Sequence, residues 1–407
     1  MRFRRLSLLL ALLLAGIPWR PAQAQAEVEV LNDDPIYAFN EFIQFSATIR
    51  SAKPIKEVLI FVGPEGADDL QVFPSGLEDP AVPDNQGRIT YRLDLKQNPF
   101  RGFSTIEYRY EVTIENGETY SSPFYLLRYL DNRYEWQELE SPPFRVYWFA
   151  GDVSFAQEVL NVAHAGEKRL PELLEVYLPE ELNIYVYSSA AEMQIALLSP
   201  SQSWIAGHSD PDLGVILVSL PFGPDQRLEI ERQIPHEMMH AALYYTDAHT
   251  YKNLPAWFNE GLASLAELYP SPEYQAILEN AFRSGGLLSM ASLCDAFPTD
   301  ANQLLLAYAQ SASFTRYLFD HFGTGGFNRL RGAYAASLGC RQGVESALES
   351  SLEALESQWL RNTFAGDAWQ EAVADLLPWT ILLLVILVGP LIMLISAVRR
   401  HKAGPEL

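Results

Sequence analysis

The sequence predicts a multidomain protein: an N-terminal all-β, immunoglobulin-like sandwich, then an α+β domain, and a C-terminal single transmembrane helix. Three observations predict this fold class. Apolar residues recur with period two up to about residue 130, they recur at helical spacing in the later half, and an uncharged apolar stretch lies near the C-terminus. Period two is typical of half-buried strands and the longer spacing of amphipathic helices. A chain of 407 residues is long enough for two or three domains.

The first 26 residues have the features of a signal peptide. A basic start precedes an apolar run, and small residues around Ala22-Gln23-Ala24 fit a cleavage site. An uncleaved N-terminal anchor is the alternative, but the apolar run is short for a membrane span. We therefore expect residues 1–26 to be removed from an exported chain.

Residues 27–130 are predicted to form the β-sandwich domain. Several runs of alternating apolar residues follow at short intervals without helical patterns between them, which is typical of a sandwich. Asn116-Gly117 separates the last two runs and supplies the positive φ angles of a tight hairpin turn. Because no cluster of metal-ligating residues lies here, we expect a spacer or recognition module that could bind a surface partner.

A polar segment over 131–143, ending in Pro142-Pro143, is predicted to be a linker. The α+β domain then covers 144–365. We expect strands over 144–150, 182–189 and 214–221 and a first helix over 154–177. Helical spacing follows, so a small sheet would precede the later helices.

The stretch 376–398 has no charged residue and is long enough to cross a bilayer, although a buried core helix is the alternative. Residues 366–375 would be a juxtamembrane segment. Basic residues begin the tail 399–407, which predicts a cytoplasmic C-terminus and an extracytoplasmic N-terminal ectodomain of a single-pass cell membrane protein.

Charge and cysteine content restrict the partners and the compartment. The formal net charge of −22 argues against nucleic acid as a partner. Cys294 and Cys340 are the two cysteines of the chain, and export would permit a disulfide between them. Two unpaired core thiols fit the sequence equally well, so the pairing stays open.

A metal-site motif lies at His236-Glu237-x-x-His240. On a helix, residues four apart share one face, so both imidazoles can reach one ion while Glu237 projects beside them. A zinc hydrolase needs two such nitrogen ligands and a carboxylate that takes a proton from water. Pro235 would break a helix bond or mark a late helix start. The alternative is a pair of core histidines, and a third ligand would decide between the two.

Glu260 is the candidate third ligand. We expect a helix from about residue 253, with Asn253 as its cap and Pro255 in the first turn. Gly261 is unfavourable in mid-helix, which indicates a close approach to the histidine-bearing helix. A lone exposed glutamate is the alternative.

His236, Glu237 and His240, followed by Glu260 within the run Trp257-Phe258-Asn259-Glu260-Gly261, resemble the gluzincin pattern. The resemblance covers about 144–365 and is to the peptidase MA-like domains of bacterial surface proteins. It implies a zincin-type metallopeptidase domain that binds Zn²⁺ through His236, His240 and Glu260, with Glu237 as general base and then general acid. It also implies that the strand 214–221 is an edge strand that could pair with a peptide substrate.

Tyr308 is our candidate for the side chain that stabilises the oxyanion, since related domains have a similar Ala-Tyr-x-x-Ser run after the third ligand. A core tyrosine with a satisfied hydroxyl is the alternative. The remaining histidines have no partner at ligand spacing and are expected to be structural or exposed.

These features together predict a membrane-anchored, extracytoplasmic zinc-dependent metallopeptidase that acts on a peptide or protein. The Gly-x-Met-Glu-Asn sequence of aminopeptidase gluzincins is absent, so we expect an endopeptidase. The alternative is a non-catalytic cell-surface binding module with a structural or vestigial zinc site. A hydrolase for another bond would use the same zinc chemistry.

Overall fold

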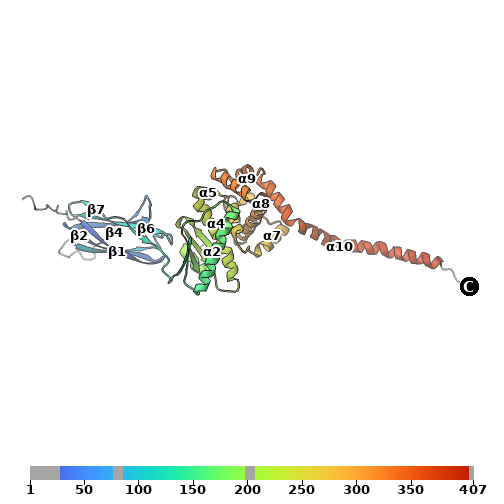
Figure 1. Ribbon diagram of the computed structural model, residues 1–407, viewed down its shortest axis with the longest axis horizontal. Coiled ribbons are helices and arrows are strands. Elements are labelled where there is room, and N and C mark those ends of the chain that lie inside the picture. The colour runs from blue at the N-terminus through green and yellow to red at the C-terminus, as the bar shows by residue number, and fades with distance from the viewer. Residues whose placement is uncertain (1–27, 77–85, 198–206, 403–407) are drawn as a thin grey trace, which may run out of the picture. The chain divides into compact units, whose positions relative to one another are not determined.

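The computed structural model describes residues 28–76, 86–197 and 207–402 (Figure 1). The predicted signal peptide, residues 1–26, lies outside them. The chain divides into two compact units, Met1–Tyr134 and Glu135–Leu407. This division falls within the stretch 131–143 that we expected to be a linker.

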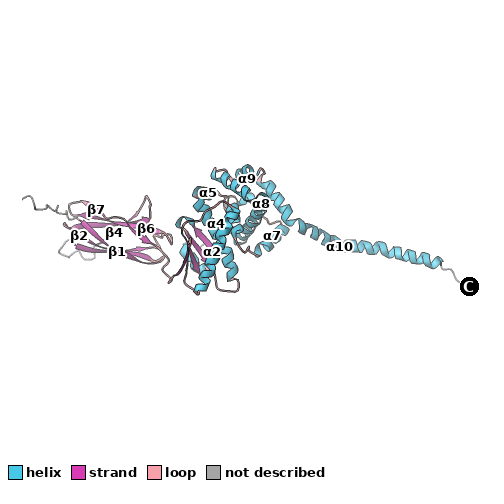
Figure 2. Ribbon diagram, in the orientation of Figure 1, coloured by secondary structure: helices cyan, strands magenta, loops and turns pink. Residues whose placement is uncertain are grey.

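The N-terminal unit is β-rich (Figure 2). One antiparallel sheet has the strand order β1-β2-β5, and the other has the order β4-β3-β6-β7, with β8 also paired to β6. The strands are β1 (Val28–Ala38), β2 (Phe42–Ser51), β3 (Ile55–Pro64), β4 (Gln71–Ser75), β5 (Gln86–Asp94), β6 (Thr105–Ile114), β7 (Thr119–Ser121) and β8 (Tyr125–Arg128).

Strand β6 shows why this sequence forms a two-layered unit. Its burial alternates residue by residue, which places Ile106, Tyr108, Tyr110 and Val112 on one buried face. Tyr110 donates a hydrogen bond to the carbonyl of Ser46 in the other sheet at 3.2 Å. The two sheets therefore pack face to face. The predicted turn at Asn116-Gly117 is also present, because β6 and β7 pair on either side of it.

The second unit begins with a five-stranded mixed sheet of order β12-β13-β11-β10-β9. The strands β10, β11 and β13 are parallel to one another, and β9 and β12 run antiparallel to their neighbours at the two edges. The bounds are β9 (Gln137–Ser141), β10 (Phe144–Trp148), β11 (Leu182–Tyr187), β12 (Gly207–Asp210) and β13 (Val215–Ser219). The sequence predicted the three central strands and missed both edges.

The expectation that the strand over 214–221 forms an edge is wrong. Strand β13 pairs with β11 on one side and with β12 on the other, so its backbone is already hydrogen-bonded on both sides. The edge beside it is β12, a strand of four residues that is too short to show period two clearly.

Helices make up the rest of the second unit. Helices α2 and α4 lie side by side next to the sheet (Figure 1). The helices are α2 (Val153–Leu173), α3 (Ala190–Leu197), η1 (Pro211–Leu213), α4 (Gln226–Thr246), α5 (Ala248–Asn253), α6 (Ala256–Ala266), α7 (Glu273–Ser284), η2 (Met290–Leu293), α8 (Ala301–Ala335), α9 (Cys340–Leu348) and α10 (Leu352–Lys402).

Helix α6 differs from its prediction in two respects. Asn253 ends α5, and the residue that precedes α6 is Pro255, so Asn253 is not the cap. Gly261 does mark a close helix contact, but the partner is α8 and not α4. A Cβ atom on Gly261 would lie 2.8 Å from the carbonyl oxygen of Ser311 and 2.7 Å from Cβ of Thr315.

The predicted fold class is wrong in its C-terminal part. A membrane span needs about 20 consecutive apolar residues in a helix. In the described part of the chain, no helix reaches the length and apolar character that crossing a bilayer requires. The predicted transmembrane helix over 376–398 is therefore not supported, nor is a membrane partner for it. The single-pass localisation with an outer N-terminus and a cytoplasmic C-terminus is withdrawn with it.

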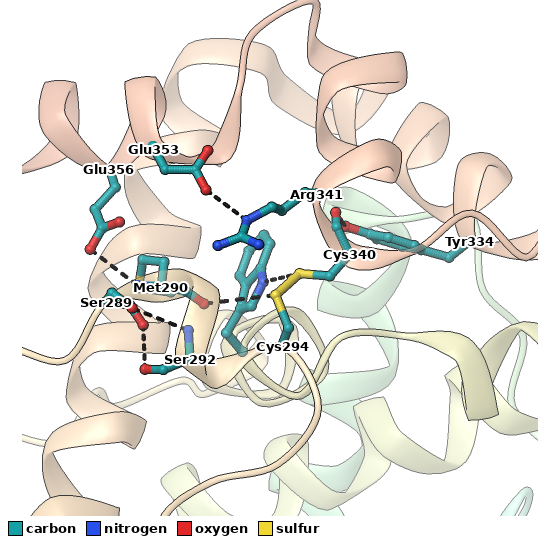
Figure 3. The surroundings of a disulfide bond; sticks show 10 residues. Ser289, Met290, Ser292, Cys294, Tyr334, Cys340, Arg341, Glu353 and Glu356 are labelled. Atoms are coloured by element: carbon teal, nitrogen blue, oxygen red, sulfur yellow. Dashed lines mark hydrogen bonds and ion pairs between the residues drawn. A yellow bond between two sulfur atoms is a disulfide. The ribbon is translucent and has the colours of Figure 1, made fainter.

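Cys294 and Cys340 form a disulfide, which resolves the alternative that the sequence left open (Figure 3). The bond joins the residue after η2 to the first residue of α9. The Trp257 indole donates to Sγ of Cys340 at 3.4 Å, and the Ala256 amide donates to the carbonyl of Cys294 at 2.9 Å. The disulfide thus lies against the start of α6.

Candidate metal centre

Helix α4 carries His236, Glu237 and His240, as the spacing predicted, but it begins at Gln226. Pro235 therefore lies inside the helix, and a late helix start is excluded. Because proline has no amide hydrogen, the carbonyl of Glu231 loses its helical donor. The backbone amide of Leu268, just beyond α6, donates to that carbonyl at 2.9 Å. The proline thus leaves an acceptor on α4 to which the end of α6 is hydrogen-bonded.

Three side-chain atoms from α4 and α6 converge on one point. The Nε2 atoms of His236 and His240 lie 3.4 Å and 3.6 Å from Oε2 of Glu260. One ligand atom from each of the three residues lies within 4.8 Å of the others. Among the described residues, this is the one group of His, Cys, Asp and Glu side chains with a geometry that could hold a metal ion.

The other ring nitrogens fix the orientation of the two imidazoles. Nδ1 of His236 donates to Oε1 of Glu267 at 3.0 Å, and Nδ1 of His240 donates to Oδ1 of Asn259 at 3.2 Å. In a neutral imidazole with a proton on Nδ1, Nε2 carries the lone pair. With each Nδ1 atom occupied in this way, Nε2 of each ring faces the Glu260 carboxylate, with which it pairs when protonated and beside which it can bind a metal ion when neutral.

The donor set fits a tetrahedral zinc ion. Bond lengths of roughly 2.0–2.1 Å and tetrahedral angles separate two ligand atoms by about 3.3 Å, and the two Nε2–Oε2 distances are close to that value. Burial opposes ionisation of Glu260, but His240 and His236 outweigh it and hold the pKa of this carboxyl below its usual range. Glu260 thus supplies the negative charge that balances a cation.

Glu237 lies beside this centre and is buried. Burial raises the pKa of Glu237, while the imidazoles of His240 and His236 act in the opposite direction. The edge strand β12 covers the carboxylate, since a Cβ on Gly207 would lie 2.5 Å from Oε1 of Glu237. A residue with a side chain would collide there, so glycine allows the backbone to approach the carboxylate.

Tyr308, from α8, lines the same cavity as His236 and Glu237. The cavity has a volume of about 230 Å³, and Gly207, Glu267 and Tyr274 also line it. Burial raises the pKa of Tyr308, and the charges of Glu260 and Glu237 add to the effect. Its hydroxyl therefore stays protonated and can act as a donor to a group bound in the cavity.

A family model described as the peptidase MA superfamily matches residues 162–365, half of the chain. This match contains both histidines and Glu260.

The chain belongs to the peptidase MA superfamily.

Its membership indicates a peptidase, and the His/His/Glu group indicates a possible metal dependence. No curated protein matches the sequence.

Solved structures add little to this peptidase MA assignment. OgpA from Akkermansia muciniphila is similar at 15% identity and a TM-score of 0.21, over 26% of this chain and 28% of OgpA. The sensor domain of the anti-sigma factor RsgI4 from Pseudobacteroides cellulosolvens is similar at 14% identity and a TM-score of 0.20, over 26% of this chain and 96% of that domain. The chain thus spans less than a third of the length of OgpA, and at these scores neither likeness carries an argument.

Sequence reasoning missed the residues that support the candidate metal-binding side chains of this peptidase MA chain. Asn259 directly precedes Glu260, and its side chain also hydrogen-bonds Tyr251. Glu267 lies two helical turns after Glu260, a spacing that could have drawn attention to it. His208 on β12 lies close enough to act electrostatically on Glu237, and its Nε2 lies 2.9 Å from Oδ1 of Asp210. No sequence signal linked β12 to α4.

Proposed function

We propose that this protein is a zinc-dependent metallopeptidase, specifically an endopeptidase, in which Glu237 is the general base. The observation that carries the proposal is the convergence of Nε2 of His236, Nε2 of His240 and Oε2 of Glu260, with the buried Glu237 next to them. The hydrogen bonds that both Nδ1 atoms donate support it further, because they leave both Nε2 atoms facing Glu260, and a pair of unrelated core histidines has no need of that arrangement.

His236, His240 and Glu260 would hold the zinc ion. When bound, zinc supplies Lewis-acid chemistry: it acidifies a water molecule and polarises a carbonyl group. Glu237 takes the proton from the water that attacks the peptide carbonyl, and it returns this proton to the amine as the carbon–nitrogen bond breaks. A buried carboxylate with a raised pKa suits both steps, since it accepts the proton and then gives it up.

The Tyr308 hydroxyl is proposed to donate a hydrogen bond to the carbonyl oxygen as negative charge develops on it. Its place in the cavity with His236 and Glu237 supports this role. Glu267 and Asn259 are proposed to position the two histidines without binding the metal. They accept hydrogen bonds from the Nδ1 atoms and so keep both imidazoles in one tautomer.

The metal content of the full-length chain tests the proposal. Plasma mass spectrometry is expected to find one zinc per chain, and His236→Ala and Glu260→Ala are expected to lose it, because each removes one of the three ligands. Peptide hydrolysis should disappear with the metal on chelation and return with added zinc. A chain without metal, or one whose metal content is indifferent to Glu260, would favour the non-catalytic binding module instead.

A further inference from the structure

A second cavity, of about 340 Å³, lies next to the one at the metal centre. Glu267, Ser271 and Tyr274 line both cavities, so the two are neighbours separated by shared side chains. Helices α6, α7, α8 and the start of α10 form the walls. The volume is within the range of binding pockets for small ligands. A chain bound across the metal centre could place one of its groups in this second cavity.

Arg316 from α8 is the basic side chain among the described residues that line this cavity. Burial lowers the pKa of Arg316, but a guanidinium stays charged at neutral pH. In the described part of the chain, no side chain hydrogen-bonds to it or forms an ion pair with it. Asp320 and Glu267 affect it electrostatically from a longer distance. The cavity therefore contains a partly buried positive charge that the protein does not neutralise by direct contact.

The two carboxylates in the lining already have other partners. Glu267 accepts from Nδ1 of His236 at 3.0 Å. Glu279 accepts from Gln275 at 2.9 Å and lies 3.9 Å from Arg283. Among the described residues, neither carboxylate forms a hydrogen bond or an ion pair with Arg316, although the charge of Glu267 acts on it from a distance, so the guanidinium can donate hydrogen bonds to a ligand.

The rest of the lining is half apolar and half polar, and one of its polar groups has no partner among the described residues. Apolar side chains reduce the access of water, which strengthens an ion pair formed between them. Ser264 also lines the cavity, and its buried hydroxyl has no hydrogen-bond partner among the described residues. The apolar lining residues are Leu265, Pro270, Leu278, Ala309, Ala312 and Phe364, and the uncharged polar ones are Ser264, Ser271, Tyr274, Gln275, Ser313 and Thr363.

We propose that this cavity is a specificity pocket that binds a carboxylate of the peptide substrate through Arg316. The inference rests on the proposed peptidase function, because it assigns a preference to that same site. A carboxylate can accept two parallel hydrogen bonds from a guanidinium, and it would neutralise a charge that is costly to bury alone. Two sources have this chemistry: the side chain of an acidic residue near the cleaved bond, and the carboxylate at the end of a peptide.

Binding to the full-length Glu237→Gln variant, loaded with zinc, tests the pocket without hydrolysis. The probes are fluorescent hexapeptides in which each position in turn carries Glu, Gln or Lys, made with either an amidated or a free C-terminus. We expect a carboxylate at one position to tighten binding about 10- to 100-fold over its neutral counterpart, the usual strength of a charge-assisted hydrogen bond. A preference for Glu in amidated peptides assigns the side chain as the source, and a preference for the free C-terminus assigns the terminal carboxylate.

Variants at Arg316 make the test specific. Combined with Glu237→Gln, Arg316→Leu should remove the preference, Arg316→Glu should reverse it in favour of Lys, and Arg316→Lys should retain part of it. Arg341→Leu is the matched control, since that arginine is exposed and pairs with Glu353 away from the cavity. Unchanged binding of the neutral peptide shows that the Arg316 variants are folded.

The outcomes separate this inference from the proposed function. Equal binding of Glu, Gln and Lys peptides, or a preference that survives Arg316→Leu, overturns the pocket even when the wild-type chain cleaves peptides. A carboxylate preference that depends on Arg316 supports the pocket even when the wild-type chain cleaves none, in which case the proposed catalysis fails and the pocket belongs to a binding protein.

Discussion

At the residue scale, two imidazoles are held by different kinds of partner. His236 donates to a carboxylate and His240 to an amide oxygen. The proposed histidine ligands could be predicted from the sequence because His236 and His240 are one helical turn apart, which is a local relation. Their partners could not, because the contacts depend on where α6 lies against α4. The second cavity and Arg316 were beyond prediction for the same reason.

Replacement of the candidate base is the sharpest test of the chemistry. Glu237→Gln keeps the size of the side chain and removes its basicity, so peptide hydrolysis is expected to fall by about 10²- to 10⁴-fold. Zinc content should remain at the wild-type level, because Glu237 is not one of the converging atoms. Metal analysis and a peptide cleavage assay on the same sample measure the zinc content and the rate of hydrolysis. Cleavage at the wild-type rate would rule out the role that we assign to this carboxylate.

Glu267 is expected to control metal affinity without touching the metal. Glu267→Ala removes the acceptor for Nδ1 of His236, and loss of such a partner typically weakens metal binding about 10- to 100-fold. Competition with a chelating dye measures this affinity. Glu353→Ala is the control, because that carboxylate is exposed and pairs with Arg341. Equal zinc affinities of the Glu267→Ala and Glu353→Ala variants would show that the hydrogen bond between His236 and Glu267 does not affect metal binding.

At the element scale, the contact of α6 with α8 fixes where Glu260 lies. The sequence indicated a close helix contact at Gly261 but gave the wrong partner helix. A glycine indicates that another element packs closely against it, but it does not identify that element. The short edge strand β12 left no periodic signal at all, yet it covers Glu237. Elements that are long and periodic, such as α2 and β11, were predicted near their observed positions, whereas the start of α4 was not.

The α6–α8 contact gives a matched pair of glycine substitutions. Gly261→Ala would push a methyl group against the backbone of Ser311, which cannot move aside, so we expect a loss of about 1–3 kcal/mol in the free energy of unfolding. Gly332→Ala, in α8, meets open space and should be neutral or stabilising by up to about 1 kcal/mol, because alanine favours helix. Urea unfolding followed by circular dichroism compares them. Similar stabilities in both variants would contradict the close packing.

At the scale of the whole molecule, the sequence separated a β-rich part from a part that contains helices, because the change of apolar period near residue 130 is a global feature. The prediction at the C-terminus failed. It relied on an uncharged apolar stretch followed by basic residues, whereas the described helices contain no segment of the required length and apolar character. The family assignment, in contrast, rested on a motif with two halves and was confirmed.

The disulfide is expected to stabilise the second unit, which contains both of its cysteines. Closing a loop with a sequence separation of 46 residues restricts the unfolded chain, and loop entropy sets the gain at about 4 kcal/mol or less. A reducing agent should therefore lower the melting temperature of this unit. The variant with Cys294→Ser and Cys340→Ser should have the melting temperature of the reduced wild-type protein, and the reducing agent should not change it. A wild-type melting temperature that does not change on reduction would exclude a stabilising role.

The proline inside α4 has a consequence for how assembly of the centre can be followed. The amide of Leu268 lies beyond the last residue of α6, yet it is bonded to the carbonyl of Glu231, which lost its own donor to Pro235. Its hydrogen should exchange with deuterium slowly, as hydrogens inside helices do, for as long as the end of α6 stays in place. This single amide would then report, in the absence of metal and substrate, the fraction of molecules in which α4 and the end of α6 are joined.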